Sequence, residues 1–168
     1  MFKKLFGKKT EEPVAKDIVL FAPMNGKVVA LEDVPDPVFA EKMMGDGLAI
    51  DPEESTVYSP VDGEIVQVFP TKHAVGIKTA NGAEILIHIG LETVGLNGEG
   101  FEAFVSAGDT VKTGDKLISF DQTIIREKAK STLIPIIITN SDEIKSIVKT
   151  AETLLTRGET QFLTVTVN

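Results

Sequence analysis

The sequence of 168 residues contains no cysteine, no tryptophan and only two histidines, His73 and His88. The lack of cysteine excludes disulfides, thiolate metal sites and thiol catalysis, and it fits a cytoplasmic protein. No apolar run approaches the roughly 18 residues of a transmembrane helix, and the apolar stretch after the first lysines is too short for a secretory signal. What remains is a globular protein with two side chains that titrate near neutral pH.

The net charge of −8 leaves no basic field to neutralise phosphates, which argues against a nucleic-acid partner. The charge is uneven, because residues 1–9 carry four lysines and no acid. Phe2, Leu5 and Phe6 fall at helical spacing among these lysines, so the segment is either an amphipathic contact with anionic lipid or a disordered leader. We therefore expect a flexible basic leader and linker over residues 1–16.

The length suits a single domain over residues 17–168. Short β-branched runs punctuated by Gly, Pro, Asn and Asp fill this region, a pattern typical of all-β proteins. The runs predict strands at Ile18–Ala22, Gly26–Ala30, Gly47–Asp51, Thr56–Tyr58, Gly63–Val68, Ala74–Thr79, Glu84–Ile89, Thr110–Val111, Lys116–Phe120, Leu133–Ile138 and Phe162–Val167. Helical patterns are confined to Pro37–Lys42, Asp121–Ala129 and Ser141–Lys149, the last opened by a Ser-Asp-Glu capping signal.

Two segments, Phe21–Val29 and Tyr58–Val66, repeat one pattern at an offset of 37 residues: an aromatic, a small residue, Pro, two residues, Gly and two β-branched positions. The echo is either coincidental turn chemistry or the mark of two related half-sheets. The second interpretation predicts an antiparallel β-sandwich or flattened barrel with a few short helical turns.

The two histidines flank a predicted hairpin. Asn81-Gly82 lies between apolar runs and favours a two-residue type I′ turn, since both turn residues need a positive φ. His88 would then pair with Val75 and His73 with Gly90, which leaves room for close approach at the glycine. Because side chains alternate along strands, one face is expected to hold Thr71, His73, Val75, Ile77, Leu86, His88 and Gly90, with the imidazoles as diagonal neighbours.

Converging imidazoles suit three chemistries. One ring can accept a phosphoryl group while the other donates a hydrogen bond to the phosphoryl oxygens, and Thr71 can fix the tautomer of His73. The pair can instead supply half of a zinc site, but no acid is expected on that face nearer than Glu84 or Glu92. Acid–base hydrolysis lacks a partner at useful spacing. The residues favour phosphoryl transfer over a zinc hydrolase.

Apolar residues around the histidines predict a docking surface. Phe39, Met43 and Met44 fall at helical spacing, and Phe69 leads directly into Thr71. Methionines in such a place are either core or contact residues. Exposed apolar groups ringed by acids would suit a basic protein partner.

The sequence resembles the IIA proteins and domains of the glucose family of the bacterial phosphoenolpyruvate-dependent sugar phosphotransferase system, from about Ile18 to the C-terminus. The resembling stretches include Ala22-Pro-Met-Asn-Gly26, Glu32–Lys42, Gly45-Asp-Gly-Leu-Ala-Ile50, Ser59-Pro-Val-Asp-Gly63, Thr71-Lys-His73, Ile87-His88-Ile-Gly90-Leu-Glu-Thr-Val94, Leu96-Asn-Gly-Glu-Gly-Phe101 and Glu127–Leu133.

This resemblance implies a β-sandwich of the duplicated hybrid type and a stoichiometric phosphoryl carrier that needs no cofactor. It implies that His88 accepts the phosphoryl group on Nε2 from the phosphocarrier HPr and passes it to the IIB domain of a sugar permease. His73 would stabilise the phosphohistidine, and Thr71 would orient His73.

The resemblance also implies that HPr, IIB and regulatory partners dock on one surface, here Val38, Phe39, Met43, Met44, Phe69, Leu86 and Gly90. In enteric relatives the unphosphorylated form inhibits permeases and glycerol kinase, in some cases through a zinc ion bridged by the two histidines, here His73 and His88, and a partner carboxylate. A regulatory binding protein is therefore the alternative function. We further expect a cytoplasmic monomer with peripheral membrane contact through residues 1–9.

Overall fold

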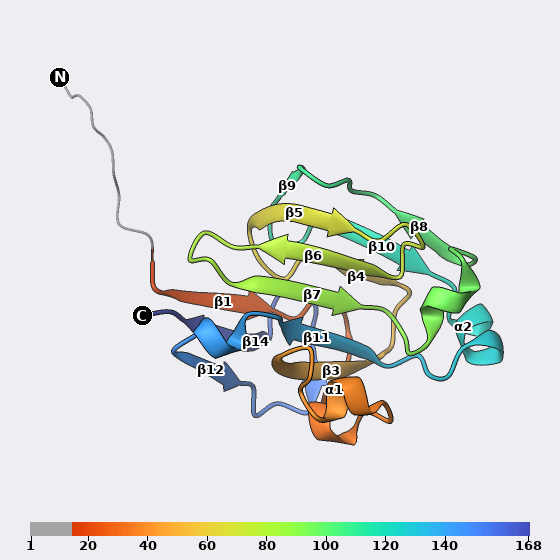
Figure 1. Cartoon of the computed structure of the whole chain (residues 1–168), viewed down its shortest axis with the longest axis horizontal. Coiled ribbons are helices and arrows are strands. Elements are labelled where there is room, and N and C mark those ends of the chain that lie inside the picture. Colours follow the sequence, from red (N-terminus) through yellow and green to blue (C-terminus); the bar gives the residue numbers. More distant parts are fainter. Residues whose placement is uncertain (1–14) are drawn as a thin grey trace.

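Three antiparallel sheets build the part of the chain that the computed structural model describes, residues 15–168 (Figure 1). The predicted leader lies outside these residues as far as residue 14, and the first strand begins at Asp17. Among the described residues, no helix has the length and apolar character needed to cross a membrane.

The largest sheet has eight strands in the order β13-β2-β3-β11-β7-β6-β5-β9. Its two ends do not pair, so the sheet is open and does not close into a barrel. The strands are β2 (Gly26–Ala30), β3 (Asp46–Pro52), β5 (Gly63–Val68), β6 (Ala74–Lys78), β7 (Glu84–His88), β9 (Thr110–Val111), β11 (Ile134–Ile138) and β13 (Leu154–Leu155).

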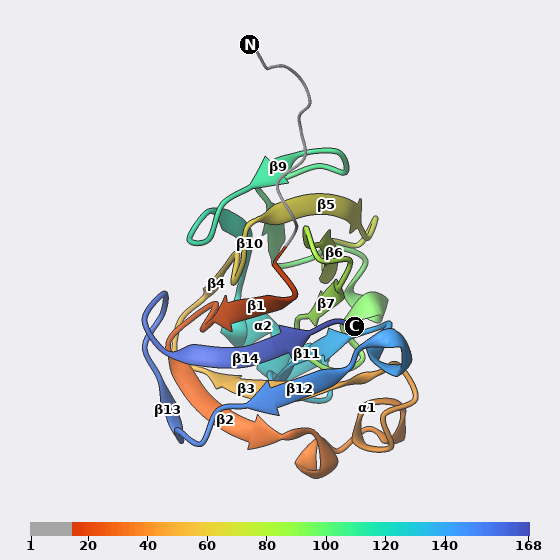
Figure 2. The same ribbon diagram turned by 90° about the vertical axis from the view of Figure 1, so that its left-hand side faces the viewer.

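Two three-stranded sheets, β1-β14-β12 and β4-β10-β8, complete the architecture. Figure 2 shows the strands of the first of them beside β2 and β3 of the large sheet. Their strands are β1 (Asp17–Phe21), β4 (Thr56–Tyr58), β8 (Phe101–Ala103), β10 (Lys116–Phe120), β12 (Ser146–Lys149) and β14 (Gln161–Thr166). The all-β, antiparallel prediction is confirmed. The helices are short: α1 (Pro37–Ala40), α2 (Gln122–Lys128), and 3-10 turns η2 (Leu31–Asp33), η3 (Thr93–Leu96) and η4 (Ser141–Glu143).

The large sheet buries its two faces against different partners. On one face Val75, Ile77, Ile85 and Ile87 belong to a large core that includes residues of β1, β10 and β14. On the other face a smaller cluster is formed by Leu31, Val34, Phe39, Ala49, Ala74, Leu86, Leu91 and Ile137. Within residues 15–168, only η2, α1 and neighbouring loops cover this second face, so it is the more thinly covered of the two.

The sequence echo has a structural counterpart. The Phe21 N–H donates to the Pro60 carbonyl at 2.8 Å, and the Tyr58 N–H donates to the Pro23 carbonyl at 2.9 Å. These residues hold equivalent positions in the two repeats, so the hydrogen bonds are reciprocal. The two repeats therefore pack as related halves, which agrees with a duplicated fold.

One helix prediction is wrong. The capping signal at Ser141 yields only the single turn η4, and the chain then enters strand β12, which pairs with β14. Ile147 and Val148 are β-branched and prefer a strand once a neighbouring edge offers hydrogen bonds. The sequence prediction also missed the short strands β8 and β13, which are held by pairing with β10 and β2 rather than by a local pattern.

Candidate functional site

The hairpin that carries the histidines pairs one residue away from the predicted register. His88 faces Ala74 instead of Val75. The Thr79 N–H donates to the Ala83 carbonyl at 3.0 Å, which leaves a three-residue loop, and Gly82 has a φ of 92°. Three-residue hairpin loops end in a residue with left-handed backbone angles. Asn-Gly is therefore compatible with both this loop and the two-residue type I′ turn.

A one-residue shift moves the side chains of one strand to the opposite face of the sheet. Val75 and Ile77, predicted beside His88, therefore lie in the large core and are fully buried. Gly90 does not lie opposite His73, because the His73 carbonyl accepts its hydrogen bond from the Ile89 N–H at 2.7 Å. The predicted shared face is thus wrong for Val75 and Ile77, and the predicted pairing of His73 with Gly90 is wrong.

The structure nevertheless brings the two imidazoles together. His73 precedes β6 and follows Lys72, whose φ of 61° belongs to a tight turn closed by the Lys72 N–H and the Phe69 carbonyl at 2.7 Å. The turn frees His73 from strand alternation. Its ring centroid lies 4.9 Å from that of His88, with the ring planes at 79°.

The tautomer of His88 follows from a backbone contact. Nδ1 lies 2.8 Å from the Gly90 carbonyl oxygen, which only accepts hydrogen bonds, so Nδ1 carries the proton and Nε2 keeps its lone pair. Gly90 has a φ of 78°, and a Cβ added there would lie 2.6 Å from Cγ2 of Thr93. Glycine is therefore required at this position for the backbone path that presents the carbonyl.

Thr71 lies against the second ring, with its hydroxyl oxygen 2.6 Å from Nδ1 of His73. A hydroxyl that donates to Nδ1 leaves the proton of the neutral ring on Nε2. His73 is 3% exposed, so its orientation is fixed by packing as well as by this bond. The two rings then present complementary nitrogens: a lone pair on Nε2 of His88 and an N–H on Nε2 of His73.

Burial keeps both rings neutral at pH 7. Desolvation, and next the charge of His88, lower the pKa of His73 to about 4. Desolvation also lowers the pKa of His88, opposed by the Gly90 carbonyl and by the Asp36 carboxylate. A neutral imidazole is the form that can act as a nucleophile.

Asp36 was missed by the sequence analysis, which placed the nearest acids at Glu84 and Glu92. Its side chain caps α1 by accepting from the Val38 N–H at 3.0 Å. An Asp followed by Pro at the first helical position is a recognisable helix start. Its proximity to His88 depends on long-range packing and has no local signal.

The predicted docking residues divide into buried and exposed groups. Phe39 is 4% exposed with its ring 5.1 Å from that of His88, and the half-buried Phe69 lies 5.4 Å from His73. Leu86 and Gly90 are also buried. The exposed members are Val38 (38%), Met44 (38%) and Met43 (70%). The methionines are therefore surface residues, not core.

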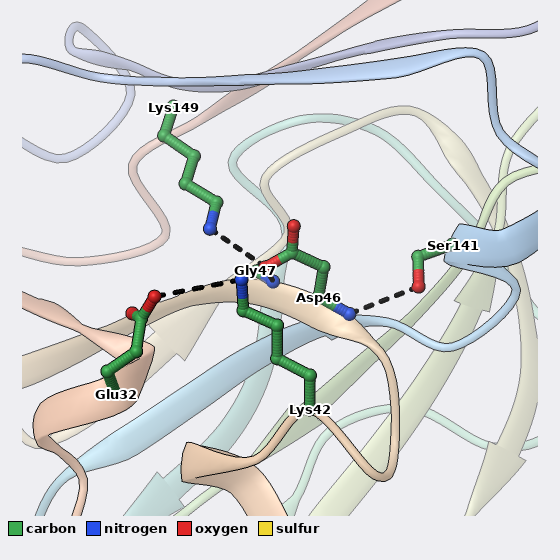
Figure 3. A network of polar contacts seen from close by, with 6 residues as sticks. All are labelled: Glu32, Lys42, Asp46, Gly47, Ser141 and Lys149. Carbon is green, nitrogen blue, oxygen red and sulfur yellow. Dashed lines mark hydrogen bonds and ion pairs between the residues drawn. The ribbon is translucent and has the colours of Figure 1, made fainter.

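A polar network fixes the turn that carries these methionines (Figure 3). Lys42 Nζ lies 3.7 Å from Glu32 and 3.6 Å from Asp46, and Lys149 Nζ lies 2.8 Å from the same Asp46 oxygen. The Asp46 N–H donates to the Ser141 hydroxyl at 3.2 Å. The network ties η2 and the turn after α1 to β3, η4 and β12.

No group of three or more His, Cys, Asp or Glu side chains that could hold a metal ion occurs within residues 15–168. His73 and His88 can supply two imidazole nitrogens. A zinc site there would need a third ligand from elsewhere.

Comparison with known proteins identifies the chain. Residues 18–144 match the family model described as phosphoenolpyruvate-dependent sugar phosphotransferase system, EIIA 1. The chain is 61% identical over 168 residues to the PTS system glucose-specific EIIA component of Bacillus cereus, with 99% of each chain covered. It is 54% identical over 168 residues to the protein of the same name from Staphylococcus aureus, with both chains covered completely.

Among solved structures, the chain is similar to glucose permease IIA from Mycoplasma capricolum, with a TM-score of 0.82 and 41% identity over 89% of this chain and 96% of that one. The resemblance stated from the sequence is thereby confirmed, and the chain belongs to the EIIA 1 family of the phosphoenolpyruvate-dependent sugar phosphotransferase system.

Proposed function

We propose that the chain accepts a phosphoryl group from the phosphohistidine of HPr on Nε2 of His88 and passes it to the IIB domain of a sugar permease. Membership of the EIIA 1 family supports a phosphoryl-carrier role. The observation that carries the choice of atom is the 2.8 Å contact between Nδ1 of His88 and the Gly90 carbonyl. It holds the proton on Nδ1 and leaves Nε2 as the nucleophile.

The transfer needs no net proton movement at His88. The P–N bond to the donor histidine breaks as the P–N bond to Nε2 forms, and the donor leaves as a neutral imidazole. The proton on Nδ1 stays on His88 and stays bonded to the Gly90 carbonyl. The phosphorylated ring gains positive charge, which the Asp36 carboxylate favours. The same geometry serves the reverse step, so the site is suited to a carrier.

His73 has a different role in this proposal. With Thr71 at Nδ1, its Nε2–H is free to donate to phosphoryl oxygens as negative charge builds near His88. Its low pKa keeps it a neutral, single-proton donor. Thr71 acts as a positioning residue, because it fixes which nitrogen of His73 carries the proton.

The exposed residues Val38, Met43 and Met44 lie in α1 and the turn after it, and Phe39 of the same helix contacts the His88 ring. This exposed apolar group suits successive docking of two protein partners. Phe39 contacts the ring of His88, and Phe69 contacts the ring of His73. Leu86 packs in the same hydrophobic cluster as these two aromatic residues. We infer that HPr and IIB contact the exposed group and reach His88 across it.

A regulatory zinc bridge is a second proposal, favoured by the pair of adjacent imidazoles that lacks a third ligand within the described residues. A partner carboxylate would complete the site, with His88 bound through Nε2 because Nδ1 is held by Gly90. Calorimetric titration with zinc should give weak binding to the chain alone. Tight binding by the isolated chain would contradict the need for a partner ligand.

The carrier proposal is tested with phosphoenolpyruvate, enzyme I and HPr. We expect one acid-labile, base-stable phosphate on the chain, and its complete loss in His88→Ala. A normal melting temperature of that variant would show that the loss is chemical. Absence of label on the wild-type chain, or full label on His88→Ala, would overturn the proposal.

A further inference from the structure

Three Asn-Gly pairs occur in the chain: Asn25-Gly26, Asn81-Gly82 and Asn97-Gly98. In any Asn-Gly pair the glycine nitrogen can attack the asparagine side-chain carbonyl, because no side chain on the glycine hinders the approach. The reaction requires that the asparagine amide and the glycine N–H are both free to move into contact. The three pairs differ sharply in this respect.

Asn81 is held at both ends of its side-chain amide. Its Nδ2 donates to the Lys16 carbonyl at 3.0 Å, and its Oδ1 accepts from the Ala83 N–H at 3.2 Å. The attacking atom is also occupied, because the Gly82 N–H donates to the Thr79 carbonyl at 3.0 Å. These bonds must break before Asn81 can react.

Asn25 is held by a different set of contacts. Its Oδ1 accepts from the Arg157 N–H at 2.8 Å. Gly26 is buried within β2, where an added Cβ would lie 2.6 Å from the Asp51 carbonyl oxygen. The backbone at Gly26 cannot rotate without disturbing the sheet.

Asn97-Gly98 has neither form of protection. Asn97 is exposed and follows η3 with a φ of 53°, and Gly98 has a φ of 89°. Within residues 15–168 no hydrogen bond engages the Asn97 side chain or the Gly98 N–H. The pair lies in an irregular segment between η3 and β8, outside every paired strand. The Gly98 carbonyl accepts one hydrogen bond, from the Phe101 N–H at 3.1 Å, and this bond leaves the attacking Gly98 nitrogen unengaged.

We propose that Asn97 is a site of spontaneous deamidation in the folded protein, whereas Asn25 and Asn81 are protected. The Gly98 nitrogen attacks Cγ of Asn97, the Cγ–Nδ2 bond breaks, and ammonia leaves with the proton of the Gly98 N–H. Water then opens the succinimide at either carbonyl to give aspartate or isoaspartate.

The modified site adjoins the histidine pair. A Cβ built on Gly98 would lie 3.8 Å from the Thr71 carbonyl oxygen, so this segment packs against the residue that contacts His73. Deamidation therefore adds a carboxylate, and in the isoaspartyl product an extra backbone carbon, beside the Thr71 turn.

The test is to incubate the full chain in mildly alkaline buffer for several days and then cleave it after glutamate. Fragments 93–99, 65–84 and 12–32 each contain one of the three pairs, since the Glu12–Pro13 bond resists cleavage. Mass spectrometry measures the replacement of NH₂ by OH, and an isoaspartate-specific methyltransferase labels the rearranged product. We expect conversion at Asn97 to be about tenfold faster or more than at Asn81 or Asn25, because Asn81 and Asn25 must first lose their local hydrogen bonds.

Denaturant and two variants sharpen the test. In urea the three pairs should convert at similar rates, because the protection is structural. Asn97→Gln should remove most of the label from the folded chain, and Asn81→Gln should not change it. Equal conversion of the three pairs in the folded chain, or an unchanged preference for Asn97 in urea, would overturn the proposal. The readout is chemical and does not depend on the proposed function.

Discussion

The two faces of the eight-stranded sheet serve different purposes. One face is covered by strands of the two smaller sheets and contains the large core, with Ile77 and Ile87 fully buried. The other face is covered by η2, α1 and loops, and it carries His88, a half-buried ring in contact with Phe39. The thin cover leaves the His88 ring half-buried, and desolvation still lowers the pKa of this imidazole. The large core and the proposed phosphoryl acceptor thus lie on opposite faces of the same sheet.

Truncation in the large core should give the largest loss of stability. For Ile77→Ala we expect roughly 2–5 kcal/mol lower free energy of unfolding, measured by urea denaturation at pH 7. The exposed Val66 on neighbouring β5 is a matched control, and Val66→Ala should change stability by less than about 0.5 kcal/mol. Equal losses in the two variants would remove the distinction between buried and exposed positions on this part of the sheet.

Acid should destabilise the protein through His73. Its pKa is 6.5 unfolded and about 4 folded, so between these values the unfolded chain binds more protons and stability falls as the pH falls. The contribution of neutral His73 to the free energy of unfolding is fully present above pH 6.5. It is lost as the pH falls to 4, and the loss is at most about 3 kcal/mol. Urea unfolding of wild type and His73→Gln across this pH range measures the difference in how steeply the free energy of unfolding depends on pH. Parallel curves for the two proteins would refute the assignment.

Replacement of His73 should affect transfer more than acceptance. In His73→Gln we expect His88 still to be labelled by HPr, while onward transfer to IIB slows by roughly tenfold or more, because a donor to the phosphoryl oxygens is weakened or displaced. Rapid-quench measurement of both half-reactions separates the two steps. If labelling itself were abolished, the roles of the two histidines would have to be exchanged.

The smallest expected effect on stability comes from the exposed surface. Met43→Ser should change the free energy of unfolding by less than about 0.5 kcal/mol, since Met43 is 70% exposed. It should raise the KM for phosphorylated HPr several-fold with little change in kcat. Leu154, 61% exposed on the edge strand β13, provides the control Leu154→Ser. Similar KM values for the two variants would argue against docking near Met43.

The fold class could be read from the sequence because turn residues and β-branched runs are local signals. The sequence also indicated that His73 and His88 lie together, but for a partly wrong reason. Asn-Gly is compatible with two loop lengths, and a shift of one residue exchanges the faces of a strand. The turn at Lys72, with its φ of 61°, restores the contact and has no clear sequence signal.

Other features had no local signal at all. The approach of Asp36 to His88 and the ion pair of Asp46 with Lys149 join segments far apart in the chain. The capping signal at Ser141 predicted a helix over β12, but the pairing of β12 with β14 outweighs that signal. These features depend on tertiary packing, which a single sequence does not report.

The pairing of β1 with β14 has a consequence for how the molecule is made. Asp17 pairs with Thr166, so the first described strand finds its neighbour only among the last residues of the chain. The small sheet that covers the large core cannot assemble until β14 has been synthesised. Contacts of such high sequence separation slow folding, typically to milliseconds or seconds for β-rich domains. The nascent chain must therefore keep its apolar strands from aggregating until β14 has left the ribosome.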